Sequence, residues 1–488
     1  MSGWETLEYY WREITAIGAF LDIILVVVTI GWVLTLKKEP TSALAWCLLV
    51  LLLPLLGPLL FVFFGYQNVH RPLSRKRRHK QHFQRSHAVT SKQLSNEAPP
   101  PVEVNSSWHV IAELANHYEA FPVHSGNAVT FYHEGESAFA AKLEAIRSAQ
   151  HHIHLEYFIF QPDDSGQLFM DALVQKAKEG IEVRLVYDAI GSHRLHRRLL
   201  RVLQAAGGKC SAFLPLSPLR RRFQVNLRNH RKILVVDGRV AFTGGLNIGE
   251  EYVSKNPRYG FWRDTHLKLE GPAVSSLQWL FIEDWDFASG ETLNSAAYFP
   301  TLDNVGSCPV QVIHSGPDQM VKSIREIYFA AILRARRRVW IASPYFVPDT
   351  GLLDALRLAG SLGVDVRFLG LYRPDKWIPL FAARYYWEEV MRAGVKVYQY
   401  TKGMMHSKLI LVDDDWASVG TANFDNRSMF LNFEVNCLIY SSEAVAELEQ
   451  AFLRDLDDAI LIEPSVYRQR PFSGRLIENF CRLLSPVL

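Results

Sequence analysis

Apolar residues follow two different patterns along this 488-residue chain. Near the N-terminus they form two long runs, 16–36 and 41–65, and the first run is interrupted by Asp22. From about residue 107 the apolar runs are short and alternate with longer amphipathic segments. Long runs are typical of membrane helices, because about 20 apolar residues cross a bilayer. Short runs that alternate with helical segments predict an α/β body.

Residues 1–66 are expected to form an N-terminal membrane anchor with two helices. The lead-in to the first run is acidic and no small-residue cleavage site follows it, so a signal peptide is not favoured. The second run contains Pro54, Gly57 and Pro58. It is therefore expected to kink, or to dip into the bilayer without crossing it straight.

A basic, Pro-containing linker is expected at 67–106. The loop between the two runs offers only Lys37 and Lys38, whereas the segment after the second run is strongly basic, with Arg71, Arg75, Lys76, Arg77, Arg78, Lys80 and Arg85. The positive-inside rule then predicts a cytoplasmic location for everything that follows. The cluster would also suit anionic headgroups, and a merely solvated linker is equally compatible with it.

The body of the chain is duplicated. Segment 152–163 parallels 338–349, and segment 180–186 parallels 363–369. We therefore predict two α/β halves, 107–300 and 301–488, the second ending in a C-terminal helix. The first half carries an insertion around 216–226 with three consecutive arginines, Arg220 to Arg222. It is either a basic loop near the site mouth or a solvated loop without a role.

The repeat is most exact in a set of polar residues. Each copy has His-x-Lys, four residues and then Asp, and a Gly-x-x-Asn segment begins seven positions later. The first copy contains His230, Lys232, Asp237 and Asn247, and the second contains His406, Lys408, Asp413 and Asn423.

These side chains suit a phosphodiester. Residues i and i+2 of a strand share a face, so each histidine points the same way as its lysine. Two such units would gather two imidazoles, two ammonium groups and two amides around one tetrahedral anion. One histidine could attack phosphorus while the other supplies a proton.

The double motif resembles the HKD motif of the phospholipase D superfamily. The resemblance implies two α/β/α sandwich halves with mixed β-sheets. Three further segments resemble bacterial cardiolipin synthases in particular: 54–60, 262–285 and 475–486.

That resemblance implies phosphatidyl transfer between two phosphatidylglycerol molecules, giving cardiolipin and glycerol through a phosphatidyl-histidine. His230 is the expected nucleophile and His406 the acid and base, although the symmetry of the motifs would allow the reverse. Lys232, Lys408, Asn247 and Asn423 would hold phosphoryl oxygens. Within each half an acid would orient the histidine, Asp264 serving His230 and Glu434 serving His406. Asp237 and Asp413 belong to the catalytic motif and are expected to brace loops or to pair with a base.

No metal or other cofactor is expected, because the lysines can neutralise the phosphate and the five scattered cysteines form no CxxC pair. The expected partners are phosphatidylglycerol and anionic membrane lipids, with no nucleic acid; an oligomer is left open. The expected location is the bacterial inner membrane, multi-pass, with the catalytic body cytoplasmic.

Three other functions compete with this interpretation. A hydrolytic phospholipase D would share the motif residues, a nuclease of the superfamily would also attack a diester, and a membrane scaffold would need neither motif. A last pattern is structural: Leu476, Phe480, Leu483 and Leu484 share one helical face near the C-terminus. Such a stripe usually faces the core, and we expect it to do so here.

Overall fold

The computed structural model describes residues 3–36, 40–62, 76, 107–215 and 226–488. It forms two compact units, Met1–Pro72 and Leu73–Leu488. The basic residues expected at 37–38, 71–75 and 77–85, the prolines at 99–101 and the arginines at 220–222 lie outside the described residues.

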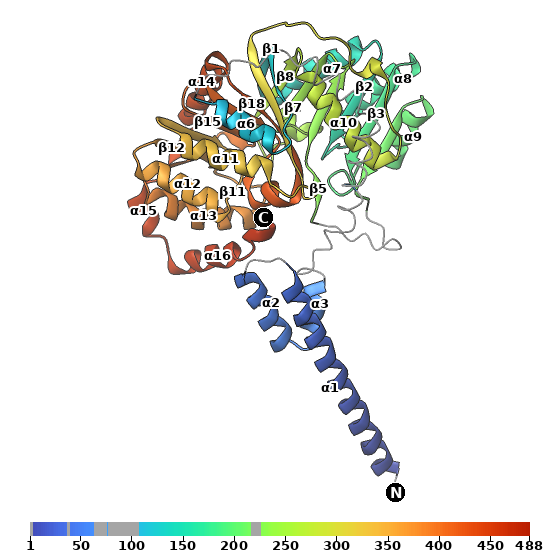
Figure 1. Cartoon of the computed structure of the whole chain (residues 1–488), viewed down its shortest axis with the longest axis vertical. Helices are drawn as coiled ribbons and strands as arrows, with labels where there is room; N and C mark the ends of the chain where they lie inside the picture. The colour runs from blue at the N-terminus through green and yellow to red at the C-terminus, as the bar shows by residue number, and fades with distance from the viewer. Residues whose placement is uncertain (1–2, 37–39, 63–75, 77–106, 216–225) are drawn as a thin grey trace. The chain divides into compact units, whose positions relative to one another are not determined.

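The N-terminal unit contains helices α1 (Gly3–Thr35), α2 (Pro40–Leu52) and α3 (Leu56–Leu60) (Figure 1). Within the described residues, one helix is long and apolar enough to cross a membrane, at Thr15–Thr35. Helix α2 has 13 residues, which at 1.5 Å per residue falls short of the roughly 30 Å hydrocarbon core. Two full crossings are therefore not supported.

Asp22 has a structural role in this unit. Its Oδ1 accepts a hydrogen bond of 2.9 Å from the backbone N–H of Leu55, which has a positive φ of 57° between α2 and α3. An unpaired N–H in hydrocarbon costs several kcal/mol. The acid within the first apolar run thus satisfies the irregular backbone of the second.

The first half of the body is a seven-stranded mixed sheet in the order β4-β3-β2-β6-β7-β8-β1. The strands β2, β3 and β4 are parallel, and the other pairings are antiparallel. Their bounds are β1 Val123–Glu134, β2 His152–Tyr157, β3 Glu182–Asp188, β4 Lys209–Phe213, β6 Lys232–Val236, β7 Val240–Gly244 and β8 Phe261–Glu270.

The second half repeats this order as β13-β12-β10-β15-β16-β18-β9, with the same pattern of parallel and antiparallel pairs. Its bounds are β9 Cys308–Ser315, β10 Arg338–Ala342, β12 Asp365–Leu371, β13 Lys396–Tyr400, β15 Leu409–Val412, β16 Trp416–Gly420 and β18 Asn432–Ile439, and β19 Ala459–Leu461 adds to the β13 edge. The duplication predicted from the sequence is therefore confirmed. The long strand β1 also pairs with β9, so the halves are joined edge to edge.

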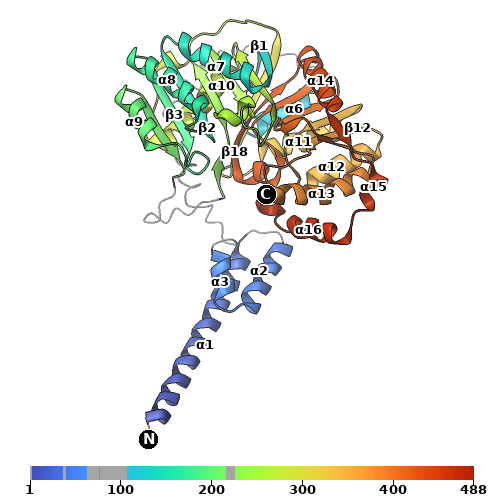
Figure 2. The same ribbon diagram turned by 180° about the vertical axis from the view of Figure 1, so that it is seen from behind.

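Helices connect and cover the strands (Figures 1 and 2). They are α6 His109–His117, α7 Gly135–Ser148, α8 Asp164–Lys178, α9 Arg197–Ala205, α10 Val274–Ser289, α11 Ser323–Arg334, α12 Thr350–Ser361, α13 Trp377–Met391, α14 Ser442–Asp457, α15 Pro464–Arg468 and α16 Phe472–Arg482. Short pieces complete the body: strands β5 Arg228–Asn229, β11 Phe346–Val347, β14 Gly403–Met405 and β17 Phe424–Asp425, and single turns at Glu250–Val253, Ala296–Tyr298, Arg427–Leu431 and Ser485–Val487.

The repeat extends to the helix caps. Asp163 caps α8 by accepting a hydrogen bond from Gly166 N, and Asp349, at the equivalent position, caps α12 by accepting one from Gly351 N. A capping carboxylate satisfies an N–H at the helix start and favours the positive end of the helix dipole. The equivalent helices α8 and α12 therefore begin with the same kind of N-cap.

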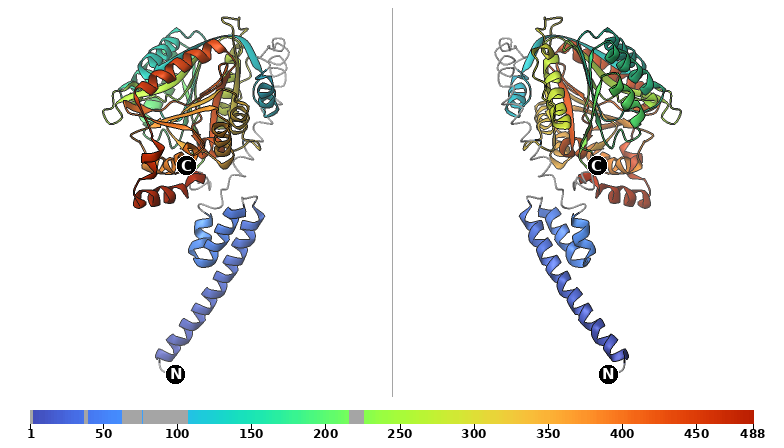
Figure 3. Two further views of the ribbon diagram at one scale, coloured as in Figure 1. Left: turned by 90° about the vertical axis from the view of Figure 1, so that its left-hand side faces the viewer. Right: turned by 90° about the vertical axis from the view of Figure 1, so that its right-hand side faces the viewer.

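The second sheet has helices against both faces, as side chain alternation along β10 shows. Val339 and Ile341 belong to a core with residues of α11, α12 and α13. Trp340 points the other way and stacks on Phe452 of α14, with ring centroids 5.2 Å apart. Figure 3 gives the side views of the two halves. The two sheets are joined and closely packed. Each motif continues into a strand of its sheet, β6 in the first half and β15 in the second.

Candidate active site

Both histidines are held by a strand of the opposite half. Short strand β5 runs parallel to β18, and the backbone N–H of His230 donates to the carbonyl of Phe433 over 2.9 Å. Strand β14 runs parallel to β8, and His406 N donates to the carbonyl of Arg263 over 2.7 Å. The two imidazoles are therefore fixed by contacts between the halves.

This register brings each histidine to the acid that follows the carbonyl. Nδ1 of His230 lies 3.0 Å from both carboxylate oxygens of Glu434. Nδ1 of His406 lies 2.9 Å from Oδ2 of Asp264. The expectation that Asp264 orients His230 and Glu434 orients His406 is wrong: the acids are the expected ones, but each serves the other half. The acid strand pairs with the opposite motif, so proximity in sequence gives the wrong partner.

The carboxylates determine which ring nitrogen is free. A carboxylate only accepts hydrogen bonds, so Nδ1 of His230 carries the proton and its Nε2 keeps its lone pair. Nδ1 of His406 lies 2.9 Å from both Asp264 Oδ2 and Lys408 Nζ, so it can donate to the carboxylate or accept from the lysine. Burial opposes ionisation of Glu434, but His230 and Lys232 outweigh it and lower the pKa of this carboxyl group. Glu434 also accepts from Thr421 Oγ1 at 2.6 Å and from Asn432 Nδ2 at 3.2 Å. Glu434 is thus a fully engaged acceptor.

Burial sets the protonation of the histidines. It lowers the pKa of His230 and of His406 to about 4 in each case. The positive charge of Lys408 lowers the pKa of both imidazoles further, as does that of Lys232. Both rings are therefore neutral at pH 7. That state suits a nucleophile, whereas a general acid must gain a proton when an anion binds.

The two motif lysines are buried beside the histidines. Lys232 Nζ donates to the backbone carbonyl of His230 over 2.8 Å, and Lys408 Nζ makes the equivalent bond to His406. Burial lowers the pKa of Lys232 to about 7 and that of Lys408 to about 8. The charge of Lys408 also contributes to the lowered pKa of Lys232. The charges of the two motifs therefore influence one another. Together they concentrate positive charge that can bind an anion.

The two asparagines differ in their contacts. Asn247 Oδ1 accepts from Ile159 N at 3.1 Å and its Nδ2 donates to Tyr252 Oη at 3.0 Å. Asn423 Oδ1 is buried and has no hydrogen-bond partner among the described residues. Because the Asn247 amide nitrogen has two N–H groups and donates one to Tyr252, its second N–H can donate to a phosphoryl oxygen.

Asp237 and Asp413 brace the start of strands. Asp237 accepts hydrogen bonds of 2.8–2.9 Å from the backbone N–H groups of 150–152. Asp413 accepts bonds of 2.8–3.1 Å from those of 336–338. Both have a positive φ, 54° and 53°. Each carboxylate ties the end of its motif strand to the start of β2 or β10.

The two copies differ at one position beside the acids. Thr421 donates to Glu434, whereas Gly245 stands at the same place in the first copy. A Cβ on Gly245 would lie 2.1 Å from Asp264 Oδ1, so a side chain cannot fit there. The difference between Gly244-Gly245 and Gly420-Thr421 in the sequence therefore indicates that the two acids have different neighbours.

Aromatic rings border the imidazoles. The ring centroid of Phe158 lies 5.0 Å from that of His230, and Trp262 lies 5.0 Å from His406. Tyr252 lies 6.4 Å from His406. The rings pack near the imidazoles and restrict their orientation.

A buried charge cluster supports the His230 segment. Arg231 bonds to Asp284, and Lys76 Nζ lies 2.6 Å from the other oxygen of the same carboxylate. Although burial opposes its ionisation, these two cations lower the pKa of Asp284. Lys76, which the sequence assigns to the linker that could meet headgroups, is 1% exposed and belongs to the body.

The family model "Cardiolipin synthase, PLD-like domain" matches residues 143–276 and 328–456, which carry the two motifs. The model "Phospholipase_D-nuclease N-terminal" matches 20–65. A cardiolipin synthase of Geobacillus thermodenitrificans is 41% identical, covering 99% of this chain and 96% of the relative.

The chain belongs to the cardiolipin synthase family. Another relative, the cardiolipin synthase of Halalkalibacterium halodurans, is 40% identical, covering 97% of this chain and 94% of its own length. Among solved structures, phosphatidylserine synthase of Haemophilus influenzae is similar, with a TM-score of 0.61 at 15% identity over 78% of this chain and 100% of that one. The family match covers both motifs, and the solved structure supports the fold alone. Among the described residues, no group of three or more His, Cys, Asp or Glu side chains could hold a metal ion.

Proposed function

We propose that this protein is a phosphatidyltransferase that converts two phosphatidylglycerol molecules into cardiolipin and glycerol. The observation that carries the proposal is the pair of imidazoles, each backed by a carboxylate of the other half and each beside a buried lysine. The relatives named cardiolipin synthase over nearly the full chain support the substrate class.

In the first step Nε2 of His230 attacks phosphorus. A phosphorus–nitrogen bond forms and the bond to the glycerol oxygen breaks. His406 gives its proton to that oxygen, so glycerol leaves as an alcohol. The phosphodiester anion raises the pKa of His406 from its low value, which lets it act as the acid. Glu434 stabilises the positive charge on the His230 ring.

In the second step His406 removes the proton from the terminal hydroxyl of another phosphatidylglycerol. The resulting oxygen attacks phosphorus and the phosphorus–nitrogen bond breaks, which frees His230. Lys232, Lys408, Asn423 and the second amide N–H of Asn247 would bind the phosphoryl oxygens. The lysines would neutralise the charge, and no metal or other cofactor takes part in this scheme.

The N-terminal unit would hold the enzyme at its substrate. Helix α1 would cross the bacterial inner membrane and α2 with α3 would form the second, dipping segment of a two-helix anchor. The body, two α/β/α sandwich halves at 107–300 and 301–488, would lie on the cytoplasmic side among phosphatidylglycerol and other anionic lipids. Neither nucleic acid nor an obligatory oligomer is part of the proposal.

Product analysis tests this function against hydrolysis. The purified full chain is incubated with phosphatidylglycerol alone, and lipids and released alcohol are measured by chromatography and mass spectrometry. The proposal predicts equal amounts of cardiolipin and glycerol. Phosphatidic acid without cardiolipin would identify a hydrolytic phospholipase D, and degradation of DNA in a parallel sample would identify a nuclease. His230→Ala serves as the inactive control.

A further inference from the structure

Helix α16 points its apolar face outward, contrary to the expectation that its stripe faces the core. The stripe residues are exposed: Leu476 59%, Phe480 67%, Leu483 68% and Leu484 38%. Phe472 and Ile477, exposed by 73% and 48%, widen the same surface. At 100° per residue these six side chains cover one continuous arc of the helix. We call these six residues the α16 apolar face.

The opposite side of α16 packs on the body. Cys481 is buried with Val347 of β11 and Ala382 of α13. Glu478 is buried and pairs with Arg470 at 2.9 Å. Contacts on the side opposite the apolar face therefore fix the orientation of the helix. A rotation that buried the apolar face would break the ion pair between Glu478 and Arg470.

The rim of the α16 apolar face is cationic. Arg475 is exposed and forms no ion pair with a carboxylate in the part of the chain that the structure describes. Arg482 lies over the ring of Tyr385, 4.3 Å from its centroid. The single acid within α16, Glu478, is buried and paired. The outward surface of this helix is thus apolar and positive.

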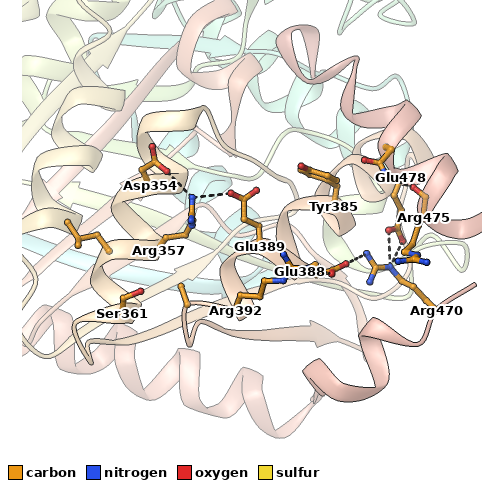
Figure 4. A pocket seen from close by; sticks show the side chains of 13 residues that line it. Asp354, Arg357, Ser361, Tyr385, Glu388, Glu389, Arg392, Arg470, Arg475 and Glu478 are labelled. Carbon is orange, nitrogen blue, oxygen red and sulfur yellow. Dashed lines mark hydrogen bonds and ion pairs between the residues drawn. The ribbon is translucent and has the colours of Figure 1, made fainter. Parts of the chain in front are cut away.

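Figure 4 shows the cavity of about 800 Å³ behind this helix, which Arg475 borders from α16. Its wall carries four arginines and four carboxylates, but the ion pairs join only Arg357, Arg392 and Arg470 to Asp354, Glu388, Glu389 and Glu478, and Arg475 takes part in none of them. This balance of charge gives no reason to assign an anion to the cavity. The unmatched feature is the outward face.

A second exposed apolar pair lies on the helix that carries α16. Trp377 and Ile378, at the start of α13, are exposed by 63% and 47%. Trp377 stacks on Phe381, which packs against the cluster that contains Cys481 of α16. Ser485, just after α16, bonds to Tyr386 Oη in the middle of α13 at 3.0 Å. Lys376 precedes this Trp. Tryptophan beside basic residues is typical of the membrane–water interface.

We propose that the α16 apolar face is a docking surface for an anionic lipid bilayer, which seats the body on the membrane independently of α1. A helix with an apolar arc and a basic rim lies in the plane of the interface, its side chains buried among the acyl chains. Phosphatidylglycerol headgroups match Arg475 and Arg482 in charge. A second copy of this face would offer no exposed carboxylate of α16 to pair with them. The choice of phosphatidylglycerol as the lipid rests on the proposed function. The exposure of the α16 apolar face is an observation that does not depend on that function.

Depth measurements on the full chain test this docking. Phe480→Cys carries an environment-sensitive fluorophore in phosphatidylglycerol vesicles, and the unsubstituted chain is labelled in parallel to subtract signal from native cysteines. Leu453→Cys on α14, a residue exposed by 40%, is the matched control. Quenching is measured with a nitroxide attached to a lipid acyl chain and with a water-soluble nitroxide.

The proposal predicts that the label at 480 is quenched several-fold more by the lipid nitroxide than the label at 453. Adding Arg475→Gln should weaken insertion about fivefold in phosphatidylglycerol vesicles and little in phosphatidylcholine. Quenching at 480 by the aqueous nitroxide alone would overturn the proposal. If the label at 480 is protected from both nitroxides and energy transfer occurs between labelled copies, the α16 apolar face is an interface between proteins. Turnover of each labelled protein in detergent is recorded separately, so that a failed docking is distinguishable from a failed function.

Discussion

Asp264 and Glu434 occupy equivalent positions after the two motifs, yet each supports the histidine of the opposite half. The resemblance to the phospholipase D superfamily selected both acids, because it implies a histidine-orienting acid at about these positions. It was insufficient to pair them, since the pairing depends on the parallel registers of β5 with β18 and of β14 with β8. Those registers join residues that are far apart in the chain.

The crossed pairing predicts different defects for the two acid variants. Asp264→Asn should disable His406 as acid and base, and Glu434→Gln should disable His230 as nucleophile, each slowing phosphatidylglycerol turnover by roughly 10²–10⁴-fold. A nitrophenyl phosphodiester, whose leaving group needs no proton, should restore release of nitrophenol in Asp264→Asn but not in Glu434→Gln. The reverse pattern of rescue would favour pairing within each half.

The lowered pKa values of Lys232 and Lys408 predict an upper pH limit for phosphate binding. Lys232 and Lys408 bind phosphate only while protonated, and their pKa values are about 7 and about 8. The affinity of the free enzyme for an unreactive phosphodiester analogue should therefore fall as the pH rises through 7–8. Lys232→Arg keeps its charge and should move the alkaline limb upward; an unchanged limb would assign it to another group.

At the scale of elements, the strands of the motifs and their order of repetition were predictable because apolar runs and glycines encode them locally. The direction of α16 was not. Helical spacing reveals that Leu476, Phe480, Leu483 and Leu484 share a face, but it does not reveal what that face meets. The deciding contact is the buried pair Glu478–Arg470, which turns the polar side inward.

Strand bracing by Asp237 and Asp413 makes a prediction about stability. Asp237→Ala removes the acceptor for the backbone N–H groups of 150–152 and places Ala at a φ of 54°. The free energy of unfolding should fall by about 2–3 kcal/mol, measured by denaturant titration. Asp237→Asn, which tolerates this φ, should lose less. Folded protein should retain turnover within a few-fold; a loss of several orders of magnitude would mean that Asp237 takes part in the chemistry.

At the scale of the whole molecule, duplication was visible in the sequence, whereas the joining of β1 to β9 was not. Apolar length alone gave two membrane runs, and one candidate span, Thr15–Thr35, is found among the described residues. The division into Met1–Pro72 and Leu73–Leu488 suggests that the body has its own core.

Removal of residues 1–66 tests that independence. The truncated chain should fold, with circular dichroism and a cooperative thermal transition, because both large cores lie in the body. It should turn over phosphatidylglycerol in detergent at a rate close to that of the full chain but sediment less with vesicles. A truncated chain that does not fold would show that the N-terminal unit is part of the structural core.

The most direct test of the two-histidine account is the location of the covalent intermediate. In His406→Ala the base that activates the acceptor is absent, so a nitrophenyl phosphodiester lipid should form an adduct that accumulates. Peptide mass spectrometry after rapid quenching should find the phosphatidyl group on His230 in His406→Ala, and no adduct in His230→Ala. An adduct on His406 in His230→Ala would reverse the two roles. No adduct on either histidine, with nitrophenol still released, would contradict the two-step mechanism and indicate direct transfer.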